Sequence, residues 1–296
     1  MTSLFILTKR NIKLYFKDKG MFFVSLITPV MLLILYITFL GKVYRDAFTQ
    51  NVPEGLVFDP KLIDGLIAGQ LISSILAVCC VTVAFCTNMI MVQDKYTNSL
   101  KDLTIAPVKK SVLSLSYFLA SLFSTLLVCY FACGLGFIYI AISGWYLTVG
   151  DVFLTLLDVF ILSSFGTALS SIIHHFLSTQ GQVSAVGTIV SSLYGFICGA
   201  YMPMSQFPKG LQKALTFLPG TYGTSLIRGH TMNSVMAKLP FPPEVISNIK
   251  ESIDISVKFF GNTVSIPVMY LILGLSTILL IGIYILINVL HKNRAK

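Results

Sequence analysis

Charged side chains are scarce in this sequence. Only 11% of its 296 residues are Asp, Glu, Lys or Arg, whereas 55% are hydrophobic. Soluble globular proteins carry about 25% charged residues, because a surface that faces water needs them. The scarcity of charge therefore excludes a water-soluble fold and predicts an integral membrane protein, with residues 1–296 forming a single transmembrane domain.

Acidic residues are outnumbered, and the formal net charge is +9. A strongly basic chain can bind nucleic acid, but the Lys and Arg residues here stand in short clusters beside apolar stretches. Anionic lipid headgroups account for clusters in such places. We therefore expect membrane lipids as partners and no nucleic acid.

The polar loops lack cysteine, and the chain lacks the usual motifs of catalytic sites. All six cysteines lie inside apolar stretches, so no disulfide framework outside the membrane is expected. The one Gly-Lys pair, Gly41-Lys42, has no earlier glycine to complete the phosphate cradle G-x-x-x-x-G-K-[ST]. Motifs of the H-E-x-x-H and nucleophile-elbow types are missing as well. The sequence thus predicts no enzyme active site, no metal site and no cofactor bound by this chain.

Long apolar stretches, by contrast, are abundant. A helix needs about 20 apolar residues to cross a hydrocarbon core of about 30 Å. Six stretches qualify, so we expect an all-α membrane protein with six transmembrane helices. The expected spans are residues 21–40, 66–92, 112–142, 152–173, 183–202 and 266–290.

The distribution of basic residues predicts the orientation of the chain. Lys and Arg cluster before the first expected span, between the second and the third, and after the last. Basic residues concentrate in short cytoplasmic segments of membrane proteins. Both termini are therefore expected in the cytoplasm, and the long loop at residues 203–265 is expected outside the cell.

The first 19 residues have the pattern of an amphipathic helix. Apolar residues that include Phe5 and Phe16 share one arc of the helical wheel, and Lys9 and Lys13 lie on the next. Such a helix lies flat in the cytoplasmic interface, with its apolar side toward the acyl chains and its lysines toward lipid phosphates. The alternative is a solvated basic tail, in which aromatic residues at this spacing have no use.

A polar segment at residues 93–111 links the second and third expected spans on the cytoplasmic side. The segment is compatible with a helix through Leu103, and Pro107 then stops that helix. A connection that only turns the chain is about 4 to 6 residues long. This longer one combines Asp94 and lysines with Leu100 and Leu103, which suits the docking of a soluble partner through an apolar anchor and a charged rim.

At these positions the sequence resembles the permeases of type-2 ATP-binding-cassette (ABC) exporters, in the branch that exports drugs and antibiotics. That family commonly carries an acidic residue, a small residue with Thr or Ser, a Leu, and then a Pro followed by Val or Leu and a basic residue. The matching residues are Asp94, Asn98, Ser99, Leu100, Leu103, Pro107 and Lys109. In relatives this region contacts the nucleotide-binding subunit, so the resemblance implies that these residues couple the chain to an ATPase.

A second element resembles the same family. It is FLPGTYGTSLIRG at residues 217–229, where Pro219, Thr221, Tyr222 and Arg228 match. The surrounding loop is rich in proline and cannot be one continuous helix. The resemblance implies two short re-entrant helices that dip into the outer leaflet before the last span. An ordinary extracellular loop is the alternative, because short apolar runs occur in both.

One carboxylate falls inside an expected span. Asp158 lies seven residues after Asp151 on the same helical face, about 10 Å into the fourth span at about 1.5 Å per residue. A carboxylate at that depth is costly unless it faces protein or water, which makes Asp158 a candidate for the transport pathway. No partner for it is visible in the sequence, and a hydrogen-bonded packing residue is the alternative.

Small residues recur every four positions in the fifth expected span. Ser191, Gly195 and Gly199 would let another helix approach closely. In relatives two permease subunits meet partly through this helix, so these residues are candidates for a dimer contact. Packing within one subunit is the alternative, since it has the same need.

Together these features imply the transmembrane subunit of a bacterial ABC exporter in the cytoplasmic membrane. The resemblance implies a second permease, expected to be identical, and a separate ATPase subunit that binds ATP and Mg²⁺. Apolar and aromatic spans with few charges favour an apolar or amphiphilic substrate: a drug, an antibiotic, a peptide or a lipid. A polysaccharide or teichoic-acid permease is one alternative, and a secondary transporter or channel that works alone is another.

Overall fold

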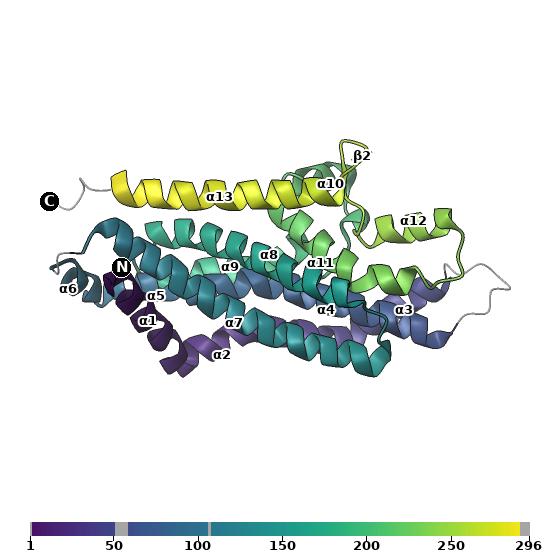
Figure 1. Ribbon diagram of the computed structural model, residues 1–296, viewed down its shortest axis with the longest axis horizontal. Coiled ribbons are helices and arrows are strands. Elements are labelled where there is room, and N and C mark those ends of the chain that lie inside the picture. Colours follow the sequence, from purple (N-terminus) through teal and green to yellow (C-terminus); the bar gives the residue numbers. More distant parts are fainter. Residues whose placement is uncertain (1, 51–58, 106–107, 291–296) are drawn as a thin grey trace.

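The computed structural model describes residues 2–50, 59–105 and 108–290. Helices make up nearly all of this part, and most lie roughly along one long axis (Figure 1). The first half contains α1 (Thr2–Lys17), α2 (Lys19–Leu35), the π-helix η1 (Tyr36–Leu40), α3 (Gly41–Gln50), α4 (Pro60–Thr87), α5 (Met89–Tyr96), α6 (Ser99–Ile105) and α7 (Lys110–Gly144). The second half contains α8 (Val149–Phe176), α9 (Gln180–Ile197), the 3₁₀ turn η2 (Met204–Gln206), α10 (Lys209–Leu215), α11 (Pro219–Met236), α12 (Pro243–Ser252), a hairpin of β1 (Lys258–Phe259) and β2 (Asn262–Thr263), and α13 (Ile266–Leu290).

Several helices begin at side chains that cap them. Asp59 accepts a hydrogen bond from the backbone N–H of Lys61 at 2.9 Å, directly before Pro60 begins α4. Thr148 and Asp151 form a reciprocal capping box at the start of α8, and Thr179 and Gln182 form another at the start of α9. These local signals place the helix starts independently of packing.

Five stretches of helix in the described residues are long and apolar enough to cross a membrane. They are Lys19–Asp46, Lys61–Tyr96, Lys110–Gly144, Val149–Phe176 and Ile266–Leu290. Five of the expected spans lie inside them, so the all-α membrane architecture is confirmed. The other expected span corresponds to α9, an 18-residue helix whose first turn holds Gln180 and Gln182. A count of six spans stays a prediction.

The expected end of α9 is wrong. The prediction extended this helix to residue 202, but it stops at Ile197. Gly199 takes a left-handed backbone conformation with φ of 71°, and the N–H of Ala200 bonds back to the carbonyl of Gly195 at 2.8 Å. This is a glycine-based helix end, which lets the chain turn back toward the loop.

The α4 helix is the centre of the bundle. In its most apolar window 83% of the residues are buried, against 17% in α13. It packs against α2, α7, α8, α9 and α11. Two glycines allow close approach, because a Cβ added at Gly69 would lie 2.9 Å from the carbonyl oxygen of Thr231 and one at Gly166 would lie 2.7 Å from that of Cys80. Backbones of α4, α8 and α11 are therefore in near contact.

The loop between α9 and α13 is more ordered than the sequence predicts. It contains α10, α11, α12 and the hairpin, so it is not one continuous helix, as its prolines require. The α11 helix runs for 18 residues and is almost wholly buried, and it is not among the helices of the described residues that are long and apolar enough to cross a membrane. It packs against α4, α8 and α13, and hence it is a core element of the bundle.

Candidate coupling site

An ion pair joins the N-terminal helix to the predicted coupling segment. Both terminal nitrogens of Arg10 in α1 bond to the carboxylate of Asp94 in α5, one of them at 3.0 Å. The hydroxyl of Tyr117 in α7 donates to the same carboxylate at 2.5 Å. The two hydrogen bonds to Asp94 raise the pKa of Arg10. One carboxylate thus fixes three helices to one another.

Apolar contacts surround this ion pair. Tyr15 of α1, Ile90 and Met91 of α5, and Leu113 and Tyr117 of α7 form one buried cluster. Its partly buried rim includes residues of α1, α2 and α6, namely Leu7, Phe16, Met21, Phe22, Leu100 and Leu103. The joint between α1, α5, α6 and α7 therefore has an apolar cluster next to the ion pair. Apolar surroundings lower the local dielectric constant, which strengthens the attraction between the two charges.

The short helix α6 stands out from this joint. None of its residues is buried, and Ile105 at its end is 83% exposed. The segment reaches it through Asn98, whose φ of 63° makes a sharp turn that asparagine tolerates better than most residues. An exposed isoleucine beside Lys101 and Asp102 is a compact surface for a protein partner.

The predicted coupling residues differ in how exposed they are. Asn98 and Lys109 are exposed, and Ser99, Leu100 and Leu103 are half-buried. Asp94 is only 4% exposed, so in this structure it has no surface to offer a partner and acts on α1 through Arg10. Pro107 lies outside the described residues.

A lysine connects the same segment to α8. The Lys95 Nζ donates to the carbonyl oxygens of His174, His175 and Leu177 at 3.0, 2.6 and 2.8 Å. These carbonyls lie at the end of α8, where carbonyl groups lack the usual intrahelical partners, although that of His174 also accepts from the N–H of Leu177 at 3.2 Å. A cation there also interacts favourably with the helix dipole. Lys95 therefore joins α5 to the end of α8, as Asp94 joins it to α1.

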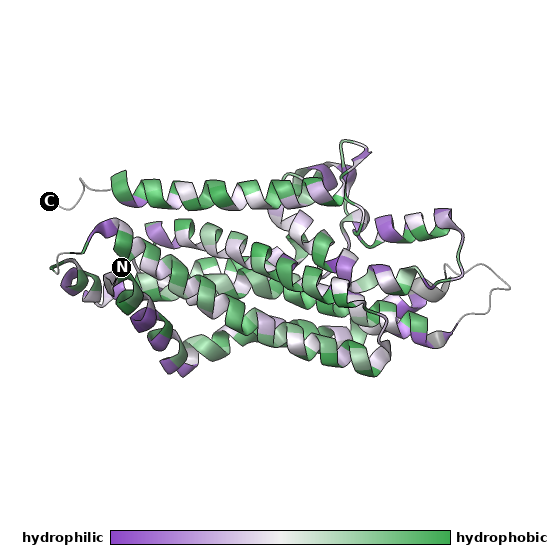
Figure 2. Cartoon of the chain, in the orientation of Figure 1, coloured by the Kyte–Doolittle hydropathy of each residue, from purple (hydrophilic) through white to green (hydrophobic). Residues whose placement is uncertain are grey.

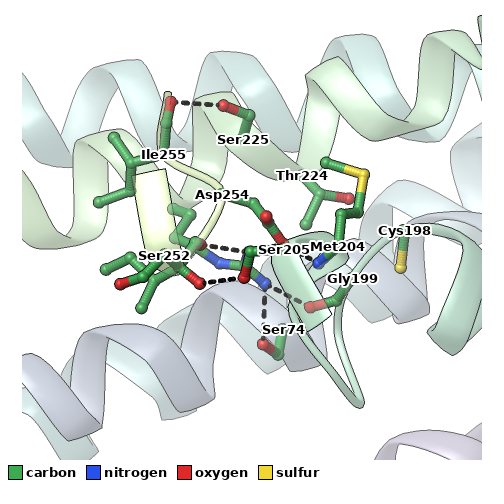
Figure 3. A network of polar contacts seen from close by, with 12 residues as sticks. Ser74, Cys198, Gly199, Met204, Ser205, Thr224, Ser225, Ser252, Asp254 and Ile255 are labelled. Atoms are coloured by element: carbon green, nitrogen blue, oxygen red, sulfur yellow. Dashed lines mark hydrogen bonds and ion pairs between the residues drawn. The ribbon is translucent and has the colours of Figure 1, made fainter. Parts of the chain in front are cut away.

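A buried arginine organises the opposite end of the bundle. Arg228 of α11 has no exposed side-chain surface. It donates to the carbonyl oxygens of Ile253 and Gly199 at 2.6 and 2.8 Å and to Ser74 at 3.4 Å, and it lies 3.5 Å from the carboxylate of Asp254. Figure 3 shows these groups converging from α4, from the turn after α9 and from the segment before the hairpin.

The rest of the second motif makes local contacts around α10. Thr221 donates to the carbonyl of Leu215 at 2.9 Å, and Tyr222 donates to that of Thr216 at 2.6 Å. Pro219 is the first residue of α11, where its missing N–H costs nothing. The four motif residues therefore fix α10, α11 and the following loop as one unit.

Asp158 has two partners that lie far from it in the sequence. One carboxylate oxygen is 2.6 Å from Nδ1 of His230 in α11, and the other accepts a hydrogen bond of 2.5 Å from the hydroxyl of Tyr270 in α13. The side chain of Asp158 is fully buried. The carboxylate is thus satisfied inside the protein and joins α8, α11 and α13.

A family model described as ABC-2 type transporter matches residues 2–231, more than three quarters of the chain. The chain belongs to the ABC-2 type transporter family. A comparison with curated proteins gave no match. This ABC-2 protein is consequently a multi-pass membrane permease, and members of its family work with an ATPase.

The interface helix of this ABC-2 permease faces two environments. Lys9 and Lys13 are exposed, and Phe5 is 70% exposed, as expected of residues that meet a membrane surface. Phe16 instead packs 4.9 Å from the ring of Tyr15, against the cluster around Asp94. Some of the apolar residues that the sequence pattern assigned to lipid therefore contact the bundle instead.

The small residues of α9 contact their own chain. A Cβ at Gly195 would lie 2.3 Å from the ring of Tyr201, and one at Gly199 would lie 2.8 Å from the carboxylate of Asp254. The carbonyl of Ser191 accepts a hydrogen bond from Tyr201 at 3.3 Å. Packing within the subunit thus explains both glycines, and a dimer contact through these residues remains a proposal.

Two cavities of the permease lie along the pair formed by α2 and α9. The one at the expected cytoplasmic end, called the inner cavity, has about 250 Å³, and its lining near the starts of both helices includes Asp18, Gln93 and Gln180. The one near their other ends, called the outer cavity, has about 780 Å³, and its lining includes Phe39 and Phe196. Both the polar and the apolar parts of an amphiphile would find a matching surface here.

Sequence reasoning missed five residues of these centres. They are Arg10, Ile105, Tyr117, His230 and Tyr270. The sequence does offer a partner for Asp94, because a buried carboxylate needs a cation and the amphipathic helix, on the same expected side of the membrane, carries Arg10. The other four carry no local signal. Among the described residues, no group of three or more His, Cys, Asp or Glu side chains could hold a metal ion.

Removal of the Tyr270 hydroxyl tests the attachment of α13. The change Tyr270→Phe leaves one oxygen of a buried carboxylate without its donor, which costs about 1.5 to 3 kcal/mol. We expect a lower midpoint of thermal unfolding in detergent, because α13 has few other buried contacts. Tyr139→Phe, at a 38% exposed tyrosine of α7, is the matched control. Equal midpoints for the two variants would contradict the assignment.

Proposed function

We propose that this chain is the transmembrane subunit of a bacterial ABC exporter that moves an apolar or amphiphilic substrate outward. The observation that carries the proposal is the joint between α1, α5, α6 and α7. It combines an exposed helix, α6, with the partly buried Arg10–Asp94 pair and with the Lys95 contact to α8. A push on α6 from a partner therefore reaches the interface helix and two long helices of the bundle.

The partner at α6 is proposed to be a separate ATPase subunit, which carries ATP and Mg²⁺. The chain has no phosphate-binding motif of its own, and its family works with an ATPase in general. Ile105 would enter an apolar pocket of that subunit, with Lys101 and Asp102 at the rim. ATP binding would then shift the permease between two states through contacts that differ between them.

The lining of the outer cavity supports an apolar or amphiphilic substrate. It consists mainly of apolar and aromatic side chains from α2, η1, α3, α9, the turn after α9 and the end of α12, among them Phe39, Tyr44, Phe196 and Tyr201. A polysaccharide would need many more hydrogen-bonding groups than this cavity provides. The inner cavity, whose lining includes Asp18, Gln93 and Gln180, would receive the headgroup end of the same molecule.

A second copy of the chain is proposed to cover the side that holds these cavities. Only 25% of the most apolar window of the first span is buried, and the exposed face of α9 includes Ala185, Thr188 and Ser192. Small side chains let helices of two subunits approach closely. Both termini are proposed to be cytoplasmic, because α6 and the basic α1 lie at the same end of the bundle (Figure 1).

Copurification tests the proposed partner. The tagged chain from its own cells should bring down an ATPase, and native mass measurement should give two permeases with two ATPases. Ile105→Asp should lower the recovery of that ATPase about tenfold, because it places a charge in an apolar contact. Ile142→Asp, at an 80% exposed isoleucine at the other end of α7, is the matched control.

Two results would overturn the proposal. ATPase recovery that is unchanged by Ile105→Asp would show that docking occurs elsewhere. Failure of any ATPase to copurify, together with transport by the chain in vesicles without ATP, would identify a transporter or channel that works alone. The change Leu103→Asp is less suitable, because Leu103 also packs against the cluster inside its own chain.

A further inference from the structure

A basic cleft lies at the end of the bundle opposite to α6. It has a volume of about 260 Å³ and is lined by Lys209 and Lys213 of α10, Lys258 of the hairpin and Glu251 of α12. The Nζ of Lys258 donates to both carboxylate oxygens of Glu251 at 2.6 Å, so these two charges compensate each other. The deeper carboxylate, Asp254, faces Arg228.

Two lysines of the cleft keep their charge available. Lys209 and Lys213 are one helical turn apart on α10, and both are exposed. Neither takes part in the salt bridges found within residues 2–50, 59–105 and 108–290. An anion that enters the cleft would meet two ammonium groups one helical turn apart, a favourable arrangement for a phosphate.

Three phenylalanines form an exposed cluster beside these lysines. The ring centres of Phe217, Phe259 and Phe260 lie 4.8 to 5.9 Å apart in edge-to-face geometry. Phe217 is 62% exposed and Phe260 61%. The Nζ of Lys213 lies 5.9 Å from the centre of the Phe260 ring. Exposed rings of this size are unfavourable in water, and next to cations they suggest a site that is both apolar and charged.

The position of the cluster relative to α13 indicates which apolar phase it meets. The hairpin ends at Thr263, and α13 starts at Ile266 and is one of the helices able to cross a membrane. Figure 1 shows α10 and the hairpin beside this end of α13, and Figure 2 shows hydrophilic residues gathered there next to the apolar helix. The patch therefore lies at headgroup level, where lysines and aromatic rings meet both phases.

We propose that these five residues, Lys209, Lys213, Phe217, Phe259 and Phe260, form an outer lipid site for one anionic phospholipid. The phosphate lies between the two lysines, and the first part of the acyl chains lies against the phenylalanine rings. A soluble anion would use the lysines and leave the rings in water. The site does not depend on an ATPase partner or on the transported substrate, so it stands apart from the proposed function.

Photocrosslinking in lipid nanodiscs tests the site directly. The full chain is placed in nanodiscs with a phosphatidylglycerol probe that carries a photoreactive diazirine near the headgroup, and adducts are mapped by mass spectrometry. We expect adducts on peptides that contain residues 209–217 or 258–261. The double change Lys209→Gln/Lys213→Gln should lower them about thirtyfold, since each lysine near an anionic surface contributes about 1 kcal/mol and about 1.4 kcal/mol corresponds to a factor of ten. Phe217→Ala/Phe260→Ala should lower adducts of both phosphatidylglycerol and phosphatidylcholine probes.

Controls in the same chain keep the result specific. Lys42→Gln/Lys61→Gln removes two exposed lysines from the segments before and at the start of α4, and should leave these adducts unchanged. Adducts on α1 serve as an internal reference in every sample. A thermal melt of each variant establishes that it is folded. If the double lysine variant does not fold, two other measurements test the lysines: labelling of Lys213→Gln alone, and labelling of the wild type at high salt, which should fall because salt screens the attraction.

Three outcomes would overturn the outer lipid site. One is equal labelling by phosphatidylglycerol and phosphatidylcholine probes at residues 209–217 and 258–261. Another is unchanged labelling in the folded lysine variants. The third is complete competition by soluble glycerol phosphate at the concentration of the probe, which would show that the cleft binds a free anion without using the phenylalanine rings.

Discussion

Arg228→Met is expected to lower the free energy of unfolding by about 3 to 5 kcal/mol, the usual cost of breaking a buried ion pair by removing one partner. The change removes the cation beside the buried carboxylate of Asp254, which keeps its hydrogen bond from the N–H of Met204, and it leaves the carbonyls of Gly199 and Ile253 without this donor. A thiol-reactive dye can follow the loss of structure on heating, because five of the six cysteines are buried and the sixth is only partly exposed.

The matched control is Arg45→Met. Arg45 forms an ion pair with Asp64, but its side chain is 51% exposed, so its loss should cost less than about 1 kcal/mol. The double variant Arg228→Met/Asp254→Asn should recover part of the lost stability, because a buried amide needs no counter-charge. If Arg228→Met and Arg45→Met unfolded at the same temperature, the interpretation of Arg228 as the organiser of this end would be wrong.

Asp94→Asn is expected to leave the docking of the ATPase intact while weakening the contact that couples the ATPase to the permease. The amide can still accept the hydrogen bond from Tyr117, but it loses the charge that holds Arg10. The guanidinium is 31% exposed, so we expect a loss of about 2 kcal/mol rather than the full value for a buried pair. α1 should then leave the bundle for a measurable fraction of the time.

Spin labels on exposed residues of α1 and α6 measure this directly. Cysteine replacements at Lys13 and Lys101, in a background without other cysteines, should give a narrow distance distribution in the parent and a broad one with Asp94→Asn. The matched control is Asp102→Asn, the same chemical change at an exposed carboxylate of α6. ATPase should copurify normally with Asp94→Asn, while its ATP hydrolysis should no longer respond to the permease. An unchanged distance distribution would refute the role of this ion pair.

Composition and periodicity predict the elements that face lipid. The expected spans at residues 112–142, 152–173 and 266–290 lie inside α7, α8 and α13, because long apolar runs leave no other fold in a membrane. The N-terminal helix is also confirmed as a helix, since its apolar residues follow the helical period. The separation of α6 from the next span follows from the helix-breaking proline between them.

The buried polar centres have no such local signature. The partners of Asp158 lie 72 and 112 residues away, and Arg10 and Asp94 are separated by 84 residues. Helix α11 looks like a loop in sequence because it carries arginine, histidine, threonine and glycine, yet it is almost wholly buried. Arg228 bonds to Ser74 of α4 and to carbonyls outside the helices, and His230 meets Asp158 of α8. Only the packing of the bundle turns these residues into core, so reading one segment at a time cannot identify them.

The central position of α4 also has a consequence for how the protein is made. Ser74 meets Arg228 across 154 residues of sequence, and the glycine contact of α4 with Thr231 is at a similar separation. At a synthesis rate of about 5 to 20 residues per second, α4 waits about 8 to 30 s before α11 exists. During that time its buried serines and Gln70 must be sheltered by the insertion machinery or by neighbouring helices, so the newborn chain is most vulnerable to degradation just before its last third leaves the ribosome.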